Sequence, residues 1–139
     1  MDRNVSPNDN TRIVVIDDNI DAADMFGSLL EAEGYATRIA YSGPAGLDLV
    51  AAFSPHVVFC DLGMPTMSDY EFAASLRARQ ALPQPLLVAV SGWGDDGARA
   101  RSCAAGFDVH LLKPTMFEDV RALLDAHMHG REGAHGSSP

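Results

Sequence analysis

The chain has 139 residues, 47% of them hydrophobic, and a formal net charge of −9 at pH 7. This length and composition are typical of one globular domain. The acidic balance disfavours a general surface for nucleic acid or for an anionic membrane, because either partner would require a basic patch.

The sequence shows no pattern of export or membrane insertion. Residues 1–11 are polar and lack the apolar segment of a signal peptide, and no apolar run approaches the ~20 residues of a membrane span. The two cysteines, Cys60 and Cys103, lack the spacing of a zinc site or a disulfide framework. We therefore expect a cytoplasmic protein without membrane or nucleic-acid partners.

Short apolar segments alternate with segments of helical periodicity along the chain. Five apolar segments predict buried strands, at residues 12–16, 35–40, 55–60, 86–90 and 108–112. Apolar positions at helical spacing follow each of them and predict helices that begin near residues 20, 43, 69, 95 and 116. The alternation predicts an α/β fold, in which helices cover both faces of a parallel sheet.

The two ends of the chain are polar or rich in Gly, Ser and Pro. We expect residues 1–10 to form a flexible segment and residues 130–139 a disordered tail after a last helix that ends near His129. The folded domain is then predicted to span residues 11–129.

Polar side chains follow four of the five predicted strands. Asp17 and Asp18 follow the first strand, Asp61 the third, Ser91 the fourth and Lys113 the fifth. Because the carboxyl ends of parallel strands meet at one edge of the sheet, we expect these side chains to converge there. The chain has nine arginines but only this one lysine, which singles out Lys113.

Three carboxylates at one edge repel one another unless a cation balances them. A site with oxygen ligands and few protein donors suits Mg²⁺, which also bridges carboxylates to phosphoryl oxygens. A carboxylate can attack phosphorus, while Mg²⁺ and an ammonium neutralise the phosphoryl oxygens and a hydroxyl donates a hydrogen bond. The sequence therefore indicates phosphoryl chemistry. The alternative for Asp17 and Asp18 is that they only complement the dipole of the helix that follows them.

Four motifs in order carry a resemblance to a known family over residues 12–128. They are VVIDDN at 14–19, DLGMP at 61–65, VSG at 90–92 and KP at 113–114. Together they resemble the receiver domain of two-component response regulators, closest in pattern to stand-alone or hybrid-histidine-kinase-type receivers. The resemblance implies a (βα)₅ flavodoxin-like (CheY-like) three-layer sandwich with a five-stranded parallel sheet of order 2-1-3-4-5.

The resemblance also implies roles for the residues at the edge of the sheet. Asp61 would accept a phosphoryl group from a histidine kinase or a histidine phosphotransfer protein. Asp18, Asp61 and the backbone carbonyl of Gly63 would bind Mg²⁺, for which Mn²⁺ can substitute, and Asp17 would act through water. Lys113 would contact the phosphoryl group.

Other family positions concern switching and the lifetime of the phosphorylated state. The resemblance implies that Ser91 moves toward the phosphoryl group and that Pro114 is cis. The switch position of the fifth strand, usually Tyr or Phe, is His110, which adds a group whose charge depends on pH. Gly63 supplies no side chain to orient water, and Trp93 could shield the acyl phosphate, which predicts a long lifetime. The alternatives are that His110 and Trp93 only pack.

The leading interpretation is a phosphoacceptor module without an output domain of its own. We expect it to act on partners through the fourth helix, fifth strand and fifth helix, and to catalyse only its own phosphoryl transfer and slow autodephosphorylation. A pseudo-receiver that works without phosphorylation is a second interpretation. An aspartate-nucleophile phosphatase is a third, disfavoured because it needs a general-acid carboxylate where this chain has Gly63.

Overall fold

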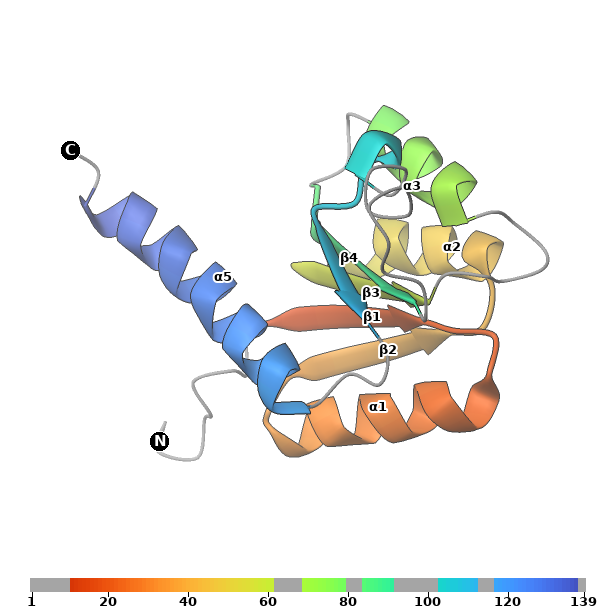
Figure 1. The fold of residues 1–139 in the computed structure, drawn as a ribbon, viewed down its shortest axis with the longest axis horizontal. Helices are drawn as coiled ribbons and strands as arrows, with labels where there is room; N and C mark the ends of the chain where they lie inside the picture. Colours follow the sequence, from red (N-terminus) through yellow and green to blue (C-terminus); the bar gives the residue numbers. More distant parts are fainter. Residues whose placement is uncertain (1–10, 62–68, 80–83, 92–102, 113–116, 138–139) are drawn as a thin grey trace.

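The computed structural model describes residues 11–61, 69–79, 84–91, 103–112 and 117–137. They contain a five-stranded sheet whose paired strands are all parallel, in the order β2-β1-β3-β4-β5 (Figure 1). The strands are β1 (Arg12–Ile16), β2 (Ala36–Ala40), β3 (Val57–Asp61), β4 (Leu86–Ser91) and β5 (Val109–Leu112). This order and the parallel direction are those of the predicted fold.

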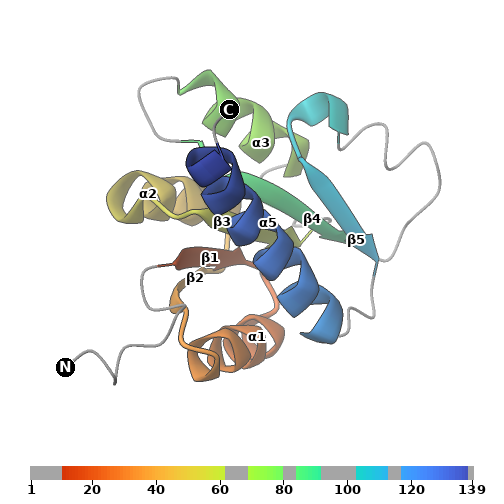
Figure 2. The same cartoon turned by 90° about the vertical axis from the view of Figure 1, so that its left-hand side faces the viewer.

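Helices lie on both faces of the sheet. Figures 1 and 2 show α1 on one side and α2 and α3 on the other. The helices are α1 (Ile20–Ala32), α2 (Gly43–Phe53), α3 (Asp69–Ala78) and α5 (Phe117–Ser137), and residues 103–105 are also helical. Among the described helices, none is long and apolar enough to cross a membrane.

Helix α5 reaches Ser137, whereas the sequence analysis ends the last helix near His129. No proline interrupts residues 117–137, and glycines weaken a helix without blocking its backbone geometry. The end of α5 extends beyond the sheet in Figure 1. The prediction of the helix end was therefore wrong, while the domain boundary at residue 129 stays a prediction.

Local sequence explains where the first two helices begin and end. The side chain of Asn19 accepts a hydrogen bond from the backbone of Ala22 at 3.0 Å and caps α1. Ser42 caps α2 in the same way, because its side chain accepts a hydrogen bond from the backbone of Ala45. Gly34 follows α1 with a φ of 99°, a conformation that glycine adopts without steric cost.

The central strands are buried on both faces. Alternate residues of β1 and β3 point to opposite faces, so that Val14 and Val58 pack under α2 and α3, while Val15 and Phe59 pack under α1 and α5. All four side chains are at most 3% exposed. The sheet edge that carries the acidic residues is thus built on a rigid apolar base.

Gly46 of α2 packs directly on this base. A Cβ there would lie 2.4 Å from Cδ1 of Ile16 and 3.4 Å from Cε1 of Phe72, and both neighbours are at most 1% exposed. We expect Gly46→Ala to lower the free energy of unfolding by about 1 to 2 kcal/mol, net of its better helix propensity. Urea denaturation measures this change.

Gly27 of α1 provides the matched control. A Cβ there would lie 2.6 Å from Cδ1 of Ile39, but Ile39 is partly exposed and can rotate away. Gly27→Ala should therefore keep or raise the stability. Equal losses for the two variants would contradict this account of α2 packing.

Tyr35 lies between α1 and α5, where Arg121 also pairs with Glu33 at 3.1 Å. Burial raises the pKa of Tyr35 above its ordinary value of 10.0, and the carboxylates of Asp125 and Glu33 raise it further, while Arg121 lowers it. The fold therefore favours the neutral phenol.

This stabilisation is complete below the ordinary pKa and is lost as the pH rises through the raised value. We expect the free energy of unfolding of the wild type to fall more steeply above about pH 10 than that of Tyr35→Phe, which cannot ionise. Urea denaturation from about pH 8 to about pH 11 makes the comparison. The same dependence of the free energy of unfolding on pH in the two proteins would exclude a contribution from the ionisation of Tyr35.

Candidate functional site

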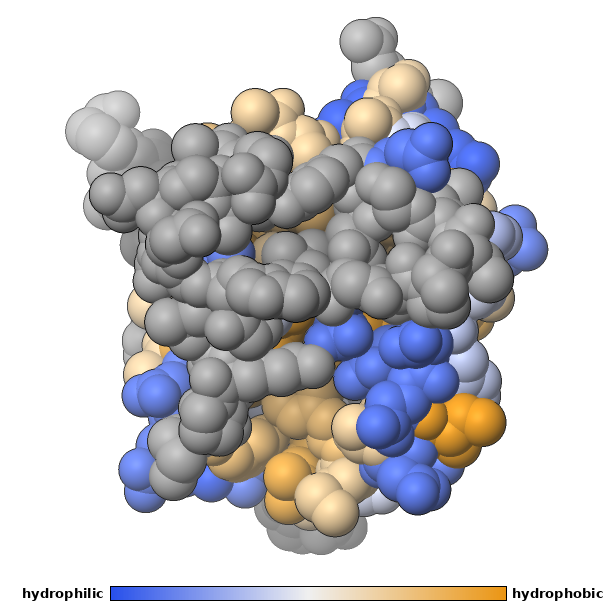
Figure 3. Space-filling model, turned by 45° about the vertical axis from the view of Figure 1, so that its right-hand side comes forward, coloured by the Kyte–Doolittle hydropathy of each residue, from blue (hydrophilic) through white to orange (hydrophobic). Residues whose placement is uncertain are grey.

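Three carboxylates meet at the carboxyl edge of the sheet. Asp17 and Asp18 follow β1, Asp61 ends β3, and one oxygen from each lies within 4.8 Å of the others. Asp17 and Asp61 are partly buried and Asp18 is exposed. Figure 3, which turns the right-hand side of Figure 1 forward, shows hydrophilic residues gathered next to hydrophobic ones on this face.

The backbone at the end of β1 fixes the position of Asp17. Its amide donates to the carbonyl of Ala40 in β2 at 3.1 Å, and its Oδ1 accepts a hydrogen bond from the amide of Asn19 at 2.9 Å. Because Asn19 also caps α1, the carboxylates lie close to the positive end of that helix dipole. The dipole offsets part of the repulsion between them.

The donor set fits a hard divalent cation. Ligands of one octahedral Mg²⁺ lie about 3 Å apart when adjacent and about 4 Å apart when opposite, so oxygens within 4.8 Å need to shift only slightly to share one ion. Carboxylates are also the ligand type that Mg²⁺ prefers. Within the described part of the chain, Asp17, Asp18 and Asp61 form the one cluster with the spacing of a metal site.

An apolar cavity adjoins this cluster. It has a volume of about 190 Å³ and is bordered by Asp17 and Asp61. All the other described residues that line it are apolar, namely Val15, Ile16, Ala22, Phe26, Phe59, Val90, Leu111 and Val120. Apolar walls lower the local dielectric constant, which strengthens the interaction of the carboxylates with a bound cation.

Ser91, at the end of β4, is hydrogen bonded to His110 of β5. The Oγ of Ser91 lies 2.7 Å from Nε2 of His110, and Ser91 is 1% exposed while His110 is only partly buried. The sequence analysis selected both residues but missed the bond between them. The bond depends on the register of β4 and β5, in which Ala89 pairs with His110 and Ser91 is a diagonal neighbour on the same face.

Four further residues that the sequence analysis selected lie outside the described residues. They are Gly63, Trp93, Lys113 and Pro114. The predicted contact of Lys113 with a phosphoryl group, the cis peptide and the lifetime effects therefore stay predictions.

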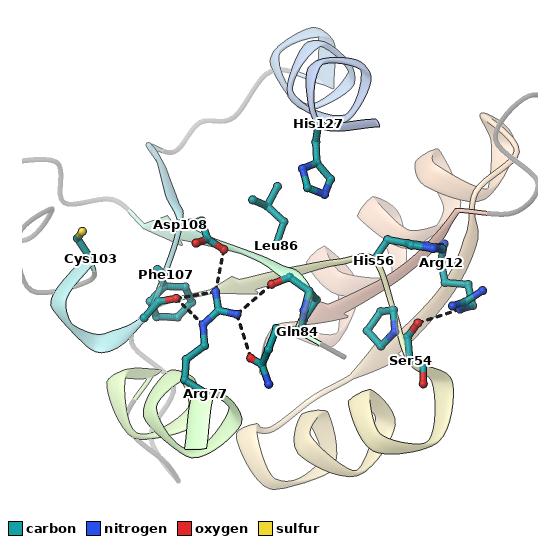
Figure 4. A pocket seen from close by; sticks show the side chains of 13 residues that line it. Arg12, Ser54, His56, Arg77, Gln84, Leu86, Cys103, Phe107, Asp108 and His127 are labelled. Carbon is teal, nitrogen blue, oxygen red and sulfur yellow. Dashed lines mark hydrogen bonds and ion pairs between the residues drawn. The ribbon is translucent and has the colours of Figure 1, made fainter. Parts of the chain in front are cut away.

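A larger cavity of about 1000 Å³ lies at the opposite edge of the sheet (Figure 4). Arg77 of α3 lines this cavity, and the sequence analysis assigned it no role. Its guanidinium donates to the carbonyls of Gly106 and Pro85, at 2.8 to 3.1 Å, and pairs with Asp108 at 2.7 Å. Arg12, also in this cavity, donates to two carbonyls at the end of α2. These arginines hold the backbone together, which is a structural role.

The carboxylate cluster predicts how stability responds to Mg²⁺. We expect Mg²⁺ at a hundredfold excess over its Kd to raise the free energy of unfolding of the wild type by about 2.7 kcal/mol. Asp61→Asn should gain little from Mg²⁺. Without Mg²⁺, this variant should be more stable than the wild type, because one of three repelling charges is gone. Urea denaturation with and without Mg²⁺ tests both effects.

Asp48→Asn is the matched control, because Asp48 is exposed on α2 and belongs to no such cluster. It should keep the full response to Mg²⁺. A full response in Asp61→Asn would show that the ion binds elsewhere.

Comparisons with known proteins identify the family of the chain. The family model of the response regulator receiver domain matches residues 13–134. The DNA-binding response regulator MtrA of Mycobacterium tuberculosis is 29% identical over 117 residues, which are 84% of this chain and 50% of that protein. The chain thus spans about half the length of the MtrA proteins it matches. The polar-differentiation response regulator DivK of Brucella ovis is 28% identical over 73% of this chain and 83% of its own.

Solved structures show the same fold. A CheY-like receiver domain from Methanospirillum hungatei superposes with a TM-score of 0.78 at 24% identity, over 88% of this chain and 96% of that one. The receiver domain of Ssk1 from Saccharomyces cerevisiae, solved with the histidine phosphotransfer protein Ypd1, superposes with a TM-score of 0.74 at 19% identity, over 80% and 83% of the two chains. The family model covers most of the sequence, and the chain therefore belongs to the response regulator receiver domain family of two-component systems.

Proposed function

We propose that Asp61 is the phosphoacceptor of a two-component phosphorelay and works with Mg²⁺. The observation that carries this proposal is the convergence of Asp17, Asp18 and Asp61, whose oxygens lie within 4.8 Å of one another at the carboxyl edge of the sheet. The donor would be the phosphohistidine of a histidine kinase or of a histidine phosphotransfer protein. The complex of the Ssk1 receiver domain with Ypd1 supports a donor of this kind.

The chemistry follows from the position of Asp61. A carboxylate oxygen of Asp61 attacks phosphorus, the bond between phosphorus and the histidine nitrogen breaks, and an acyl phosphate forms on Asp61. Asp18, Asp61 and the carbonyl of Gly63 would hold Mg²⁺, which would supply charge neutralisation for the phosphoryl oxygens. Asp17, whose Oδ1 accepts from the amide of Asn19, would act on that ion through water.

The remaining roles belong to the same proposal. Ser91 and Lys113 contact the phosphoryl group, and His110 takes part in switching. The output surface comprises the fourth helix, β5 and α5, and it binds a downstream protein in the cytoplasm. The chain catalyses only its own phosphoryl transfer and slow autodephosphorylation.

Phosphorylation from a small donor tests the proposal. The full chain is incubated with acetyl phosphate and Mg²⁺, and its intact mass is measured before and after treatment with hydroxylamine, which cleaves acyl phosphates. We expect the mass of one phosphoryl group on the wild type and its loss with hydroxylamine. Omission of Mg²⁺ should prevent the modification.

Two variants locate the modified residue. Asp61→Asn should stay unmodified, because an amide is a poor nucleophile, and the exposed Asp48→Asn should be modified like the wild type. An unmodified wild type with acetyl phosphate and with a phosphorylated histidine donor would favour a pseudo-receiver.

A further inference from the structure

The hydrogen bond between Ser91 and His110 uses the hydroxyl that the proposed function assigns to the phosphoryl group. Ser91 Oγ and His110 Nε2 are 2.7 Å apart, which is a short distance for an oxygen and a nitrogen. Ser91 belongs to β4 and His110 to β5, so the bond joins two neighbouring strands at the carboxyl edge of the sheet. The bond therefore belongs to the surroundings of Asp61.

A serine hydroxyl carries one hydrogen, and this limits what it can do at one time. When Nε2 of His110 carries no hydrogen, Ser91 has to donate its own hydrogen to Nε2. Phosphoryl oxygens are acceptors and need that same hydrogen. When Nε2 carries a hydrogen, it donates to Ser91 Oγ and leaves the hydrogen of Ser91 for the phosphoryl group.

We propose that Nε2 of His110 accepts the hydrogen of Ser91 in the resting state, which makes His110 a positioning residue, so that a phosphoryl group on Asp61 has to take the hydroxyl from His110. This inference rests on the proposed function, in which Ser91 donates to the phosphoryl group. It assigns the ring nitrogen Nε2 of His110 a hydrogen-bonding role, and the rings of Tyr and Phe contain no nitrogen that could take this role.

The burial of the two residues makes such an exchange possible. Ser91 is 1% exposed, and a buried hydroxyl that gives up a hydrogen bond without a replacement is costly, so a phosphoryl oxygen has to replace the bond to His110. His110 is only partly buried, and water can replace the bond that it loses. The cost of the exchange is therefore about that of one net hydrogen bond.

A phosphoryl analogue measures the competition. Beryllium trifluoride with Mg²⁺ is titrated into the full-length wild type and into His110→Phe, His110→Gln, Ser91→Ala and the double variant Ser91→Ala/His110→Phe, with calorimetry as the readout. We expect His110→Phe to bind about two- to tenfold more tightly than the wild type, the factor that one net hydrogen bond contributes. His110→Gln, which keeps a hydrogen-bonding group, should bind like the wild type.

The double variant separates positioning from packing. In the Ser91→Ala background, His110→Phe should leave the affinity unchanged, because the bond between residues 91 and 110 is already absent there. In the wild type, the ¹⁵N shift of His110 Nε2 should change when the analogue binds, and in Ser91→Ala it should not. This spectrum needs no substitution at His110, so it decides the question even where His110→Phe does not fold.

The outcomes that would overturn the inference are distinct from a failure of the proposed function. Normal binding by the wild type with an unchanged affinity of His110→Phe, or the same change in both backgrounds, overturns the positioning role alone. Absence of binding by the wild type, with no difference from Asp61→Asn, overturns the proposed function and this inference with it.

Discussion

Repulsion among three carboxylates is the constraint on which the site depends. The pairing of Ile16 with Cys60 places the next residues of the two strands, Asp17 and Asp61, at the same level of the sheet edge. The backbone ladder of β1 and β3 therefore holds these charges together, and they cannot separate without breaking hydrogen bonds of the central strands. A bound cation would offset the repulsion that the fold imposes on the carboxylates. Cation binding would therefore also raise the free energy of unfolding.

The free energy that maintains this arrangement comes from parts of the molecule away from the site. Both faces of β1 and β3 are covered by apolar clusters. At the opposite edge, Arg77 connects α3 to the starts of β4 and β5 through the carbonyls of Pro85 and Gly106 and through Asp108, which also accepts from the amide of Leu87. These bonds fix the starts of β4 and β5 at the edge of the sheet opposite the carboxylates.

The sequence was sufficient for features that depend on patterns along the chain. Apolar runs closed by breakers predicted the strands, and the rule that parallel strands end at one edge predicted that Asp17, Asp18 and Asp61 would meet. The rest depends on geometry between elements. The sequence shows Arg77 only as a cation at the end of a predicted helix, because its partner Gly106 is 29 residues away in the chain. The length of α5 depends on helix propensities, which glycine lowers without abolishing the helix.

His110 shows how one side chain can connect the site to the opposite face of the sheet. Side chains of a strand alternate, so Val109 and Leu111 point away from His110 and pack in the cluster that contains Val120 and Leu124 of α5. Ser91 holds β5 from one face, while α5 rests on the other. A change in the Ser91 to His110 bond therefore acts on the strand that α5 covers, and it requires no contact between α5 and the carboxylates.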